Sequence, residues 1–97
     1  MRHEILLAPQ AVLDLKGLPA HERTAVRAAM ELHLRNQPTR VSRSRIKRLR
    51  GLSKPQYRMR VGDVRVFYDV SEGRVKVLAV ILESEASRWL QEEGERQ

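Results

Sequence analysis

Arginines on either side of a tight turn are the residues of this sequence best suited to chemistry. Arg58 and Arg60 precede Gly62-Asp63, and Arg65 follows it, in a run that alternates apolar and polar residues. Glycine at the first position of a two-residue loop is typical of a type II′ turn, so the run predicts a β-hairpin. Guanidinium groups stay protonated and form charge-assisted hydrogen bonds with phosphate oxygens. A cluster of them would suit a phosphodiester and could stabilise the negative charge that develops when such a bond is cleaved.

The turn fixes the register that we expect for this hairpin. The predicted cross-strand pairs are Val61 with Val64, Arg60 with Arg65, Met59 with Val66, Arg58 with Phe67 and Tyr57 with Tyr68. One face is then apolar and belongs to a core, whereas the other carries the arginines and Phe67. Like charges directly opposite each other destabilise a sheet, because their Cβ atoms lie only about 5 Å apart. A bound polyanion would relieve this repulsion, and an aromatic ring beside the arginines suits a nucleotide.

Basic residues are concentrated in the middle of the chain. The protein has 97 residues and a formal net charge of +7, and 11 of its 19 Lys and Arg residues lie between residues 35 and 65, where the only acid is Asp63. Such a zone predicts binding to nucleic acid or to an acidic protein, and the alternative is a solubilising surface. The residues that we assign to nucleic-acid contacts are Arg45, Lys47, Arg48, Arg50 and Lys54. Phe67 is a further candidate because it shares the arginine face, and a helix packed on that face would explain it equally well. Trp89 is expected to pack in a core or, alternatively, to stack on a base.

Other kinds of site find little support in the composition. The chain has no cysteine, which excludes disulfides and thiolate metal sites and is compatible with a reducing cytoplasm. His3, His21 and His33 are scattered without metal-ligand spacing, so we expect surface or packing roles for them, and neither a metal nor a cofactor. No apolar run approaches the roughly 20 residues that cross a membrane, and the first residues lack a full signal-peptide core. We therefore expect one cytoplasmic domain over residues 1–97, without membrane contact.

The elements that must position the arginines follow from the hydrophobic periodicity. We expect a strand at residues 3–8, helices at 9–16 and 20–36, a loop at 39–44, a short turn pinned by Ile46 and Leu49, the hairpin at 57–68 and an apolar strand at 74–82. A last helix is expected from Glu85 to about residue 93, capped by Ser84 and ended by Gly94. The order β-α-α-β-β-β-α predicts an α+β fold in which two N-terminal helices pack on a small antiparallel sheet.

This arrangement resembles the RelE/ParE toxin superfamily, and the RelE-like branch in particular. The matching segments are residues 47–51 (Lys-Arg-Leu-Arg-Gly), 57–68 and 75–81, together with a first helix within residues 11–19, and the resemblance covers residues 3–90. It implies the toxin of a type II toxin–antitoxin system. RelE-like members are metal-independent ribonucleases that cleave mRNA in the ribosomal A site, whereas ParE-like members poison DNA gyrase. Both are neutralised by an antitoxin encoded beside them, which charge complementarity predicts to be acidic where it covers the arginines.

The resemblance also implies roles for individual residues. Arg58, Arg60 and Arg65 match basic catalytic positions, whereas Glu83 and Trp89 stand where RelE has a basic residue and a tyrosine. Metal-free RNA cleavage needs a base, a stabiliser of the phosphorane charge and an acid for the 5′-oxygen. Arginine is a poor base, so Glu83 is the candidate base, and the alternative is a salt bridge between Glu83 and one of the arginines.

The sequence leaves three functions open. The first is a ribosome-dependent endoribonuclease that acts on mRNA. The second is a gyrase-binding toxin without nuclease chemistry. The third is a degenerate member of the superfamily that binds only its antitoxin or RNA.

Overall fold

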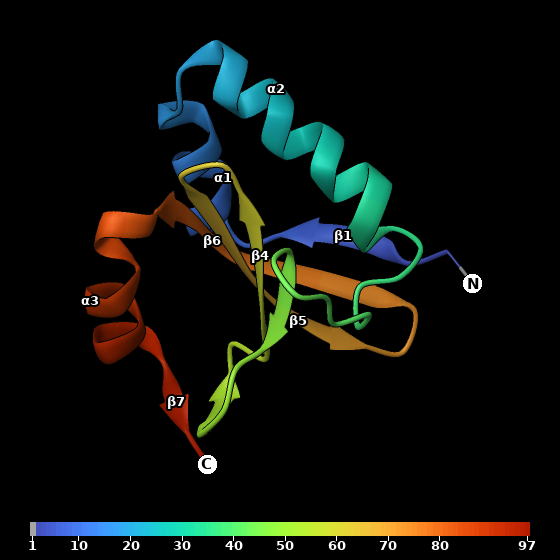
Figure 1. The fold of residues 1–97 in the computed structure, drawn as a ribbon, viewed down its shortest axis with the longest axis vertical. Helices are drawn as coiled ribbons and strands as arrows, with labels where there is room; N and C mark the ends of the chain where they lie inside the picture. The colour runs from blue at the N-terminus through green and yellow to red at the C-terminus, as the bar shows by residue number, and fades with distance from the viewer. Residues whose placement is uncertain (1) are drawn as a thin grey trace.

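The computed structural model describes residues 2–97 as an α+β fold (Figure 1). Its elements are β1 (Glu4–Leu7), α1 (Pro9–Gly17), α2 (Ala20–Ala29), the π-helical η1 (Met30–Leu34), β2 (Ile46–Arg48), β3 (Leu52–Lys54), β4 (Tyr57–Val61), β5 (Val64–Ser71), β6 (Arg74–Leu82), α3 (Glu83–Glu93) and β7 (Glu95–Arg96). The strands form a five-stranded sheet in the order β1-β6-β5-β4-β2 and a two-stranded sheet of β3 and β7. Within residues 2–97, none of the helices combines the length and the apolar character that a membrane span requires.

The hairpin of β4 and β5 has the register that its turn predicts. Arg60 lies opposite Arg65 and Arg58 lies opposite Phe67, as expected. Gly62 has a φ of +58°, whereas Asp63 is not in the positive-φ region. A positive φ at only the first central residue is the pattern of a type II′ turn, whose twist matches that of the flanking strands. The turn therefore places the arginines on one face of the sheet.

Helices cover both faces of the large sheet. In Figure 1, α1 and α2 lie above the sheet and α3 lies to its left. The main core lies on the side of α1 and α2 and includes Val26 and Tyr68. A smaller cluster on the opposite side contains Phe67, Ala79 and Ala86, the last of these from α3. The face that carries the arginines is thus shared between α3 and the basic side chains.

The α+β class and the two N-terminal helices are as expected, but the sheet is mixed. β1 pairs with β6 in parallel, whereas the expected sheet was antiparallel. The hydrophobic pattern of a strand fixes which face it buries but not the direction in which it runs. The short strands β2, β3 and β7 were also not expected. Of these, β2 matters for the site, because it places Lys47 opposite Arg58 at the edge of the large sheet.

The last helix begins earlier than expected, and this brings a carboxylate to the arginines. α3 starts at Glu83 rather than Glu85, and no side chain caps it, so the predicted Ser84 cap is wrong. The backbone N–H of Glu83 donates instead to the carbonyl of Asp63, at 2.8 Å. This hydrogen bond ties the start of α3 to the hairpin turn. It also holds Glu83 beside Arg65.

Candidate functional site

The basic face of the hairpin forms the floor of an open hollow of about 430 Å³. Residues from β2, β4, β5, the start of α3 and the loop before β2 line it, namely Arg43, Ser44, Lys47, Arg58, Arg60, Arg65 and Glu83. We call this surface the arginine hollow. The arginines predicted from the hairpin register, together with Lys47 and Glu83, therefore meet in one place.

Arg58 lies half-buried in the middle of this surface. It has Lys47 opposite it on β2 and Phe67 opposite it on β5. Burial, followed by the positive charge of Arg65, lowers the pKa of Arg58, and Glu83 opposes this effect. A lowered pKa means that the charged guanidinium is destabilised relative to water. An anion bound in the hollow would restore the lost stabilisation.

Arg65 is held in place by its own surroundings. Its Nε lies 2.7 Å from Oε2 of Glu83, and its Nη1 donates to the carbonyls of Gly62 at 2.7 Å and Val64 at 3.1 Å. The side chain is only 12% exposed, whereas that of Glu83 is 59% exposed. Within the described residues these bonds use Nε and Nη1, which leaves Nη2 for a ligand. The salt-bridge interpretation of Glu83 therefore describes the observed geometry, and the hollow stays open beside the pair.

Phe67 does not face the hollow. It is 1% exposed, and its ring stacks on that of Trp89 with centroids 5.0 Å apart and planes 19° from parallel. Ala86 and Leu90 of α3 cover the same cluster. The alternative of a helix packed on this face describes Phe67, and its assignment to nucleotide contacts is wrong, because α3 covers that part of the sheet. Trp89 packs in this second core, as the packing interpretation expected.

The other basic residues predicted to contact nucleic acid are spread over several surfaces. Arg48 and Arg50 line a separate depression of about 550 Å³ with Val41 and Lys47. The guanidinium of Arg48 lies 5.1 Å from the centre of the Tyr57 ring, a cation–π distance. Arg45 lines a further pocket, on the other side of its loop. Lys54 belongs to the small sheet and does not line the hollow.

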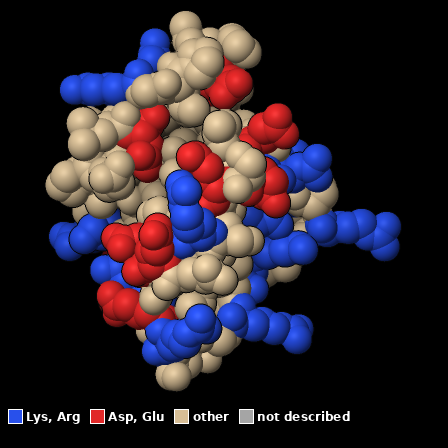
Figure 2. Space-filling view, turned by 90° about the vertical axis from the view of Figure 1, so that its left-hand side faces the viewer, with Lys and Arg blue, Asp and Glu red and all other residues tan. Residues whose placement is uncertain are grey.

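Figure 2 shows the side of the molecule that carries α3, where acidic and basic side chains are interspersed. Basic side chains project from the right-hand edge and along the bottom of this view, and others lie at the upper left. The concentration of basic residues in the middle of the sequence therefore does not make this whole face basic.

Two residues of the hollow were not singled out from the sequence. Arg43 and Ser44 belong to the loop before β2. The signal available for them was the density of basic residues there, which does not say which way a loop turns. The structure brings no His, Cys, Asp or Glu residues together in residues 2–97 as a group of three or more that could hold a metal ion.

Comparison with known proteins gives matches at the level of structure. No protein-family model matches the sequence, and no curated protein matches it. Among solved structures, the RelE–RelB complex of Pyrococcus horikoshii OT3 has 25% sequence identity and a TM-score of 0.69 over 84% of this chain and 96% of the other. The RelBE2 toxin–antitoxin complex of Mycobacterium tuberculosis has 25% sequence identity and a TM-score of 0.67, and the match covers 84% of this chain and 99% of the other. The DinJ–YafQ complex of E. coli shares the fold, with 18% sequence identity and a TM-score of 0.66. That match covers 87% of this chain and 96% of the other.

These similarities define the class of the protein. Its α+β architecture is that of the small toxins found in these complexes, and it spans nearly their whole length. The chain has the fold of RelE-like toxins, and the resemblance seen in the sequence is confirmed by this structural similarity.

Proposed function

We propose that this protein is the toxin of a type II toxin–antitoxin pair and that it cleaves mRNA at the ribosome. The observation that carries the proposal is the arginine hollow, in which Arg58, Arg60 and Arg65 meet on the sheet of a RelE-like fold. Repulsion among these charges is costly without a ligand, and a phosphodiester is the ligand that would offset it.

The hollow suits one part of RNA cleavage well. In the metal-free reaction the 2′-oxygen forms a bond to phosphorus and loses its proton, the bond from phosphorus to the 5′-oxygen breaks, and that oxygen gains a proton. Negative charge builds up on the phosphorus oxygens in between. Donors from Arg58, Arg60 and Nη2 of Arg65 would stabilise that charge, and preorganised donors of this kind are often the largest contribution to catalysis. Because β4 and β5 hold these side chains, little rearrangement is needed when the charge develops.

The hollow offers few side chains that could act as the general base or the general acid of the reaction. Among the residues that line the hollow, Glu83 is the one whose side chain is a strong proton acceptor, and it is occupied with Arg65 at 2.7 Å. We therefore assign Glu83 to positioning Arg65 rather than to general-base catalysis. The remaining groups would come from the ribosome and the RNA itself, which makes the reaction ribosome-dependent.

The partner that silences the toxin would cover the same surface. The solved structures with the same fold include complexes of RelE with RelB and of YafQ with DinJ. By analogy we assign this chain an antitoxin partner whose covering segment is acidic, because it must neutralise the basic residues of the hollow.

A ribosome-bound cleavage assay tests the proposal. Purified protein is mixed with ribosomes that carry a defined mRNA, and primer extension locates new 5′ ends. Cleavage is expected with the unmodified protein, is expected to be lost in Arg60→Ala, and is expected to persist in the matched control Lys16→Ala, which removes an exposed charge on α1. Absence of cleavage by the unmodified protein on several mRNAs would contradict nuclease function.

A gyrase-binding toxin without nuclease chemistry is the second candidate. The ion pair between Glu83 and Arg65 favours it, because a carboxylate occupies an arginine that cleavage would use. It predicts intact mRNA in the ribosome assay together with inhibition of purified gyrase.

A further inference from the structure

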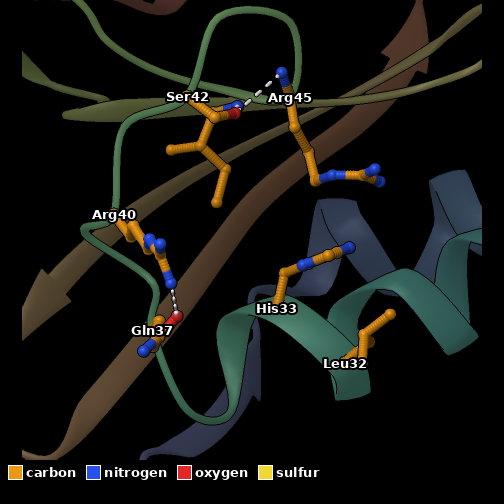
Figure 3. Close-up of a pocket in the computed structure, with 7 residues that line it drawn as sticks. Leu32, His33, Gln37, Arg40, Ser42 and Arg45 are labelled. Atoms are coloured by element: carbon orange, nitrogen blue, oxygen red, sulfur yellow. Dashed lines mark hydrogen bonds between the residues drawn. The ribbon is translucent and has the colours of Figure 1, made fainter.

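A second pocket lies on the other side of the loop that borders the arginine hollow. It has a volume of about 450 Å³ and is formed between η1 and the segment that leads into β2 (Figure 3). Its polar lining consists of His33, Gln37, Arg40, Ser42 and Arg45. The basic zone of the sequence included the two arginines, but nothing in the hairpin pattern pointed to this pocket.

The hydrogen bonds of Ser42, Gln37 and Arg40 leave mainly donors of these side chains free to meet a ligand. The Oγ of Ser42 accepts the backbone N–H groups of Arg45 at 3.1 Å and Ile46 at 3.2 Å, so its own O–H remains free to donate. The Oε1 of Gln37 accepts from Nη1 of Arg40 at 3.0 Å, which leaves the amide NH₂ of Gln37 and the other N–H groups of Arg40 (Figure 3). A pocket lined in this way is suited to an oxyanion.

The charge of the pocket points to the same ligand. No carboxylate from residues 2–97 lines it, and neither Arg40 nor Arg45 has an ion pair within that part of the chain. Burial and, after it, the positive charge of Arg45 lower the pKa of the half-buried His33, so the positive field is felt inside the pocket. An anion would be stabilised there by both arginines.

The loop connects this pocket to the arginine hollow. Ser42 and Arg45 line the pocket, whereas Arg43 and Ser44, between them in the chain, line the hollow. The N–H of Arg60 donates to the carbonyl of Arg45 at 2.8 Å, which fixes the loop to β4. A ligand that carries a phosphate in every unit of its chain can cross the loop and occupy both sites.

The rim of the pocket is suited to the apolar part of such a unit. Leu32 of η1 lines the pocket and is 69% exposed, so it does not belong to the buried core. An exposed leucine beside cationic donors can contact a ribose or a base while the donors hold the phosphate.

We propose that this pocket binds a backbone phosphate of the same RNA strand that occupies the arginine hollow, and that it positions the strand for cleavage without taking part in the chemistry. This inference rests on the proposed function in one respect, namely that RNA is the ligand. Arg40, Arg45, Ser42 and Gln37 are its positioning residues.

Binding of a non-cleavable RNA to the full chain tests the inference. The probe is a fluorescent, fully 2′-O-methylated RNA of about 12 nucleotides. In the double variant Arg40→Gln/Arg45→Gln we expect binding to weaken by roughly tenfold. We also expect the slope of log affinity against log salt to become shallower by about 0.7 for each phosphate that the variant no longer neutralises.

Two further variants separate this inference from the proposed function. Lys16→Gln/Arg27→Gln removes the same charge from exposed positions on α1 and α2 and is expected to bind within about twofold of the unmodified protein. Arg58→Gln/Arg60→Gln removes charge from the hollow and is expected to lose binding. If the hollow variant loses binding but the pocket variant matches the control, the inference is overturned and the proposed function stands. If neither variant loses binding, both are overturned.

A measurement on the unmodified protein keeps the test independent of variant folding. The ¹H–¹⁵N signals of the His33 imidazole are expected to shift when the RNA is added, and to shift much less with inorganic phosphate or with polyglutamate of the same length. Equal shifts with polyglutamate would indicate a general anion surface and would overturn the RNA assignment. A shift with inorganic phosphate but not with RNA would overturn it in favour of a free-phosphate site.

Discussion

Replacing Glu83 with glutamine distinguishes a positioning role from a general-base role. Glutamine keeps an oxygen that can accept from Nε of Arg65 but cannot take up a proton as a carboxylate does. In the structure the carboxylate lies 2.7 Å from that Nε and is more than half exposed. Glu83→Gln therefore keeps the size and shape of the side chain and removes its negative charge and its capacity to accept a proton.

The expected magnitudes follow from this geometry. Ion pairs with an exposed partner contribute roughly 0.2–1 kcal/mol, so Glu83→Gln should lower the free energy of unfolding by less than about 1 kcal/mol. Removing one negative charge from the hollow should strengthen RNA binding, because a unit charge about 4 Å away contributes about 1 kcal/mol in water, or about fivefold in affinity. If Glu83 only positions Arg65, cleavage should change by less than about tenfold, whereas loss of a general base costs about 10²- to 10⁴-fold.

Measurements of stability, affinity and cleavage resolve the two roles. Urea unfolding can be followed by fluorescence of Trp89, the single tryptophan of the chain. RNA binding uses the methylated probe, and cleavage uses single-turnover reactions on programmed ribosomes. We expect a nearly unchanged stability, tighter RNA binding and cleavage close to that of the unmodified protein. A hundredfold or larger loss of cleavage with unchanged RNA binding would refute the positioning assignment and establish Glu83 as the base.

The remaining predictions concern the arginines and the core. Arg60→Ala and Arg65→Ala should each abolish growth inhibition on induction while circular dichroism shows an intact fold, and full toxicity in both would contradict the assignment of the hollow. Tyr68→Phe should cost about 1–2 kcal/mol in urea unfolding, because the buried Tyr68 hydroxyl donates to the Pro38 carbonyl at 2.7 Å, and an unchanged stability would show that this bond contributes little. Burial also raises the pKa of Tyr68. Below about pH 10, Tyr68 is neutral in both the folded and the unfolded protein. Above about pH 10, the Tyr68 hydroxyl loses its proton in the unfolded chain only, which stabilises the unfolded state. The free energy of unfolding should therefore fall more steeply with alkaline pH in the unmodified protein than in Tyr68→Phe.

The hairpin could be predicted from sequence because local rules determine it. Gly62 at the first position of a two-residue loop fixed the register, and alternation of residue types fixed the faces. The meeting of Arg58, Arg60 and Arg65 follows from those two facts alone. The α+β class followed from the order of periodic segments.

Features that depend on distant segments could not be predicted in this way. The parallel pairing of β1 with β6 is decided by packing, and neither strand encodes its direction. Phe67 was expected to share the exposed basic face, but α3 folds over it, and alternation within a strand does not say what covers a face. The contributions of Arg43 and of the pocket around His33 depend on the path of a loop, which residue types do not specify.

Mapping of mRNA 5′ ends in cells after induction would show whether the protein cleaves translated mRNA. We expect new ends in phase with codons within translated regions, and we expect them to disappear in Arg65→Ala. Intact transcripts in growth-arrested cells, together with gyrase-linked DNA breaks, would contradict this expectation.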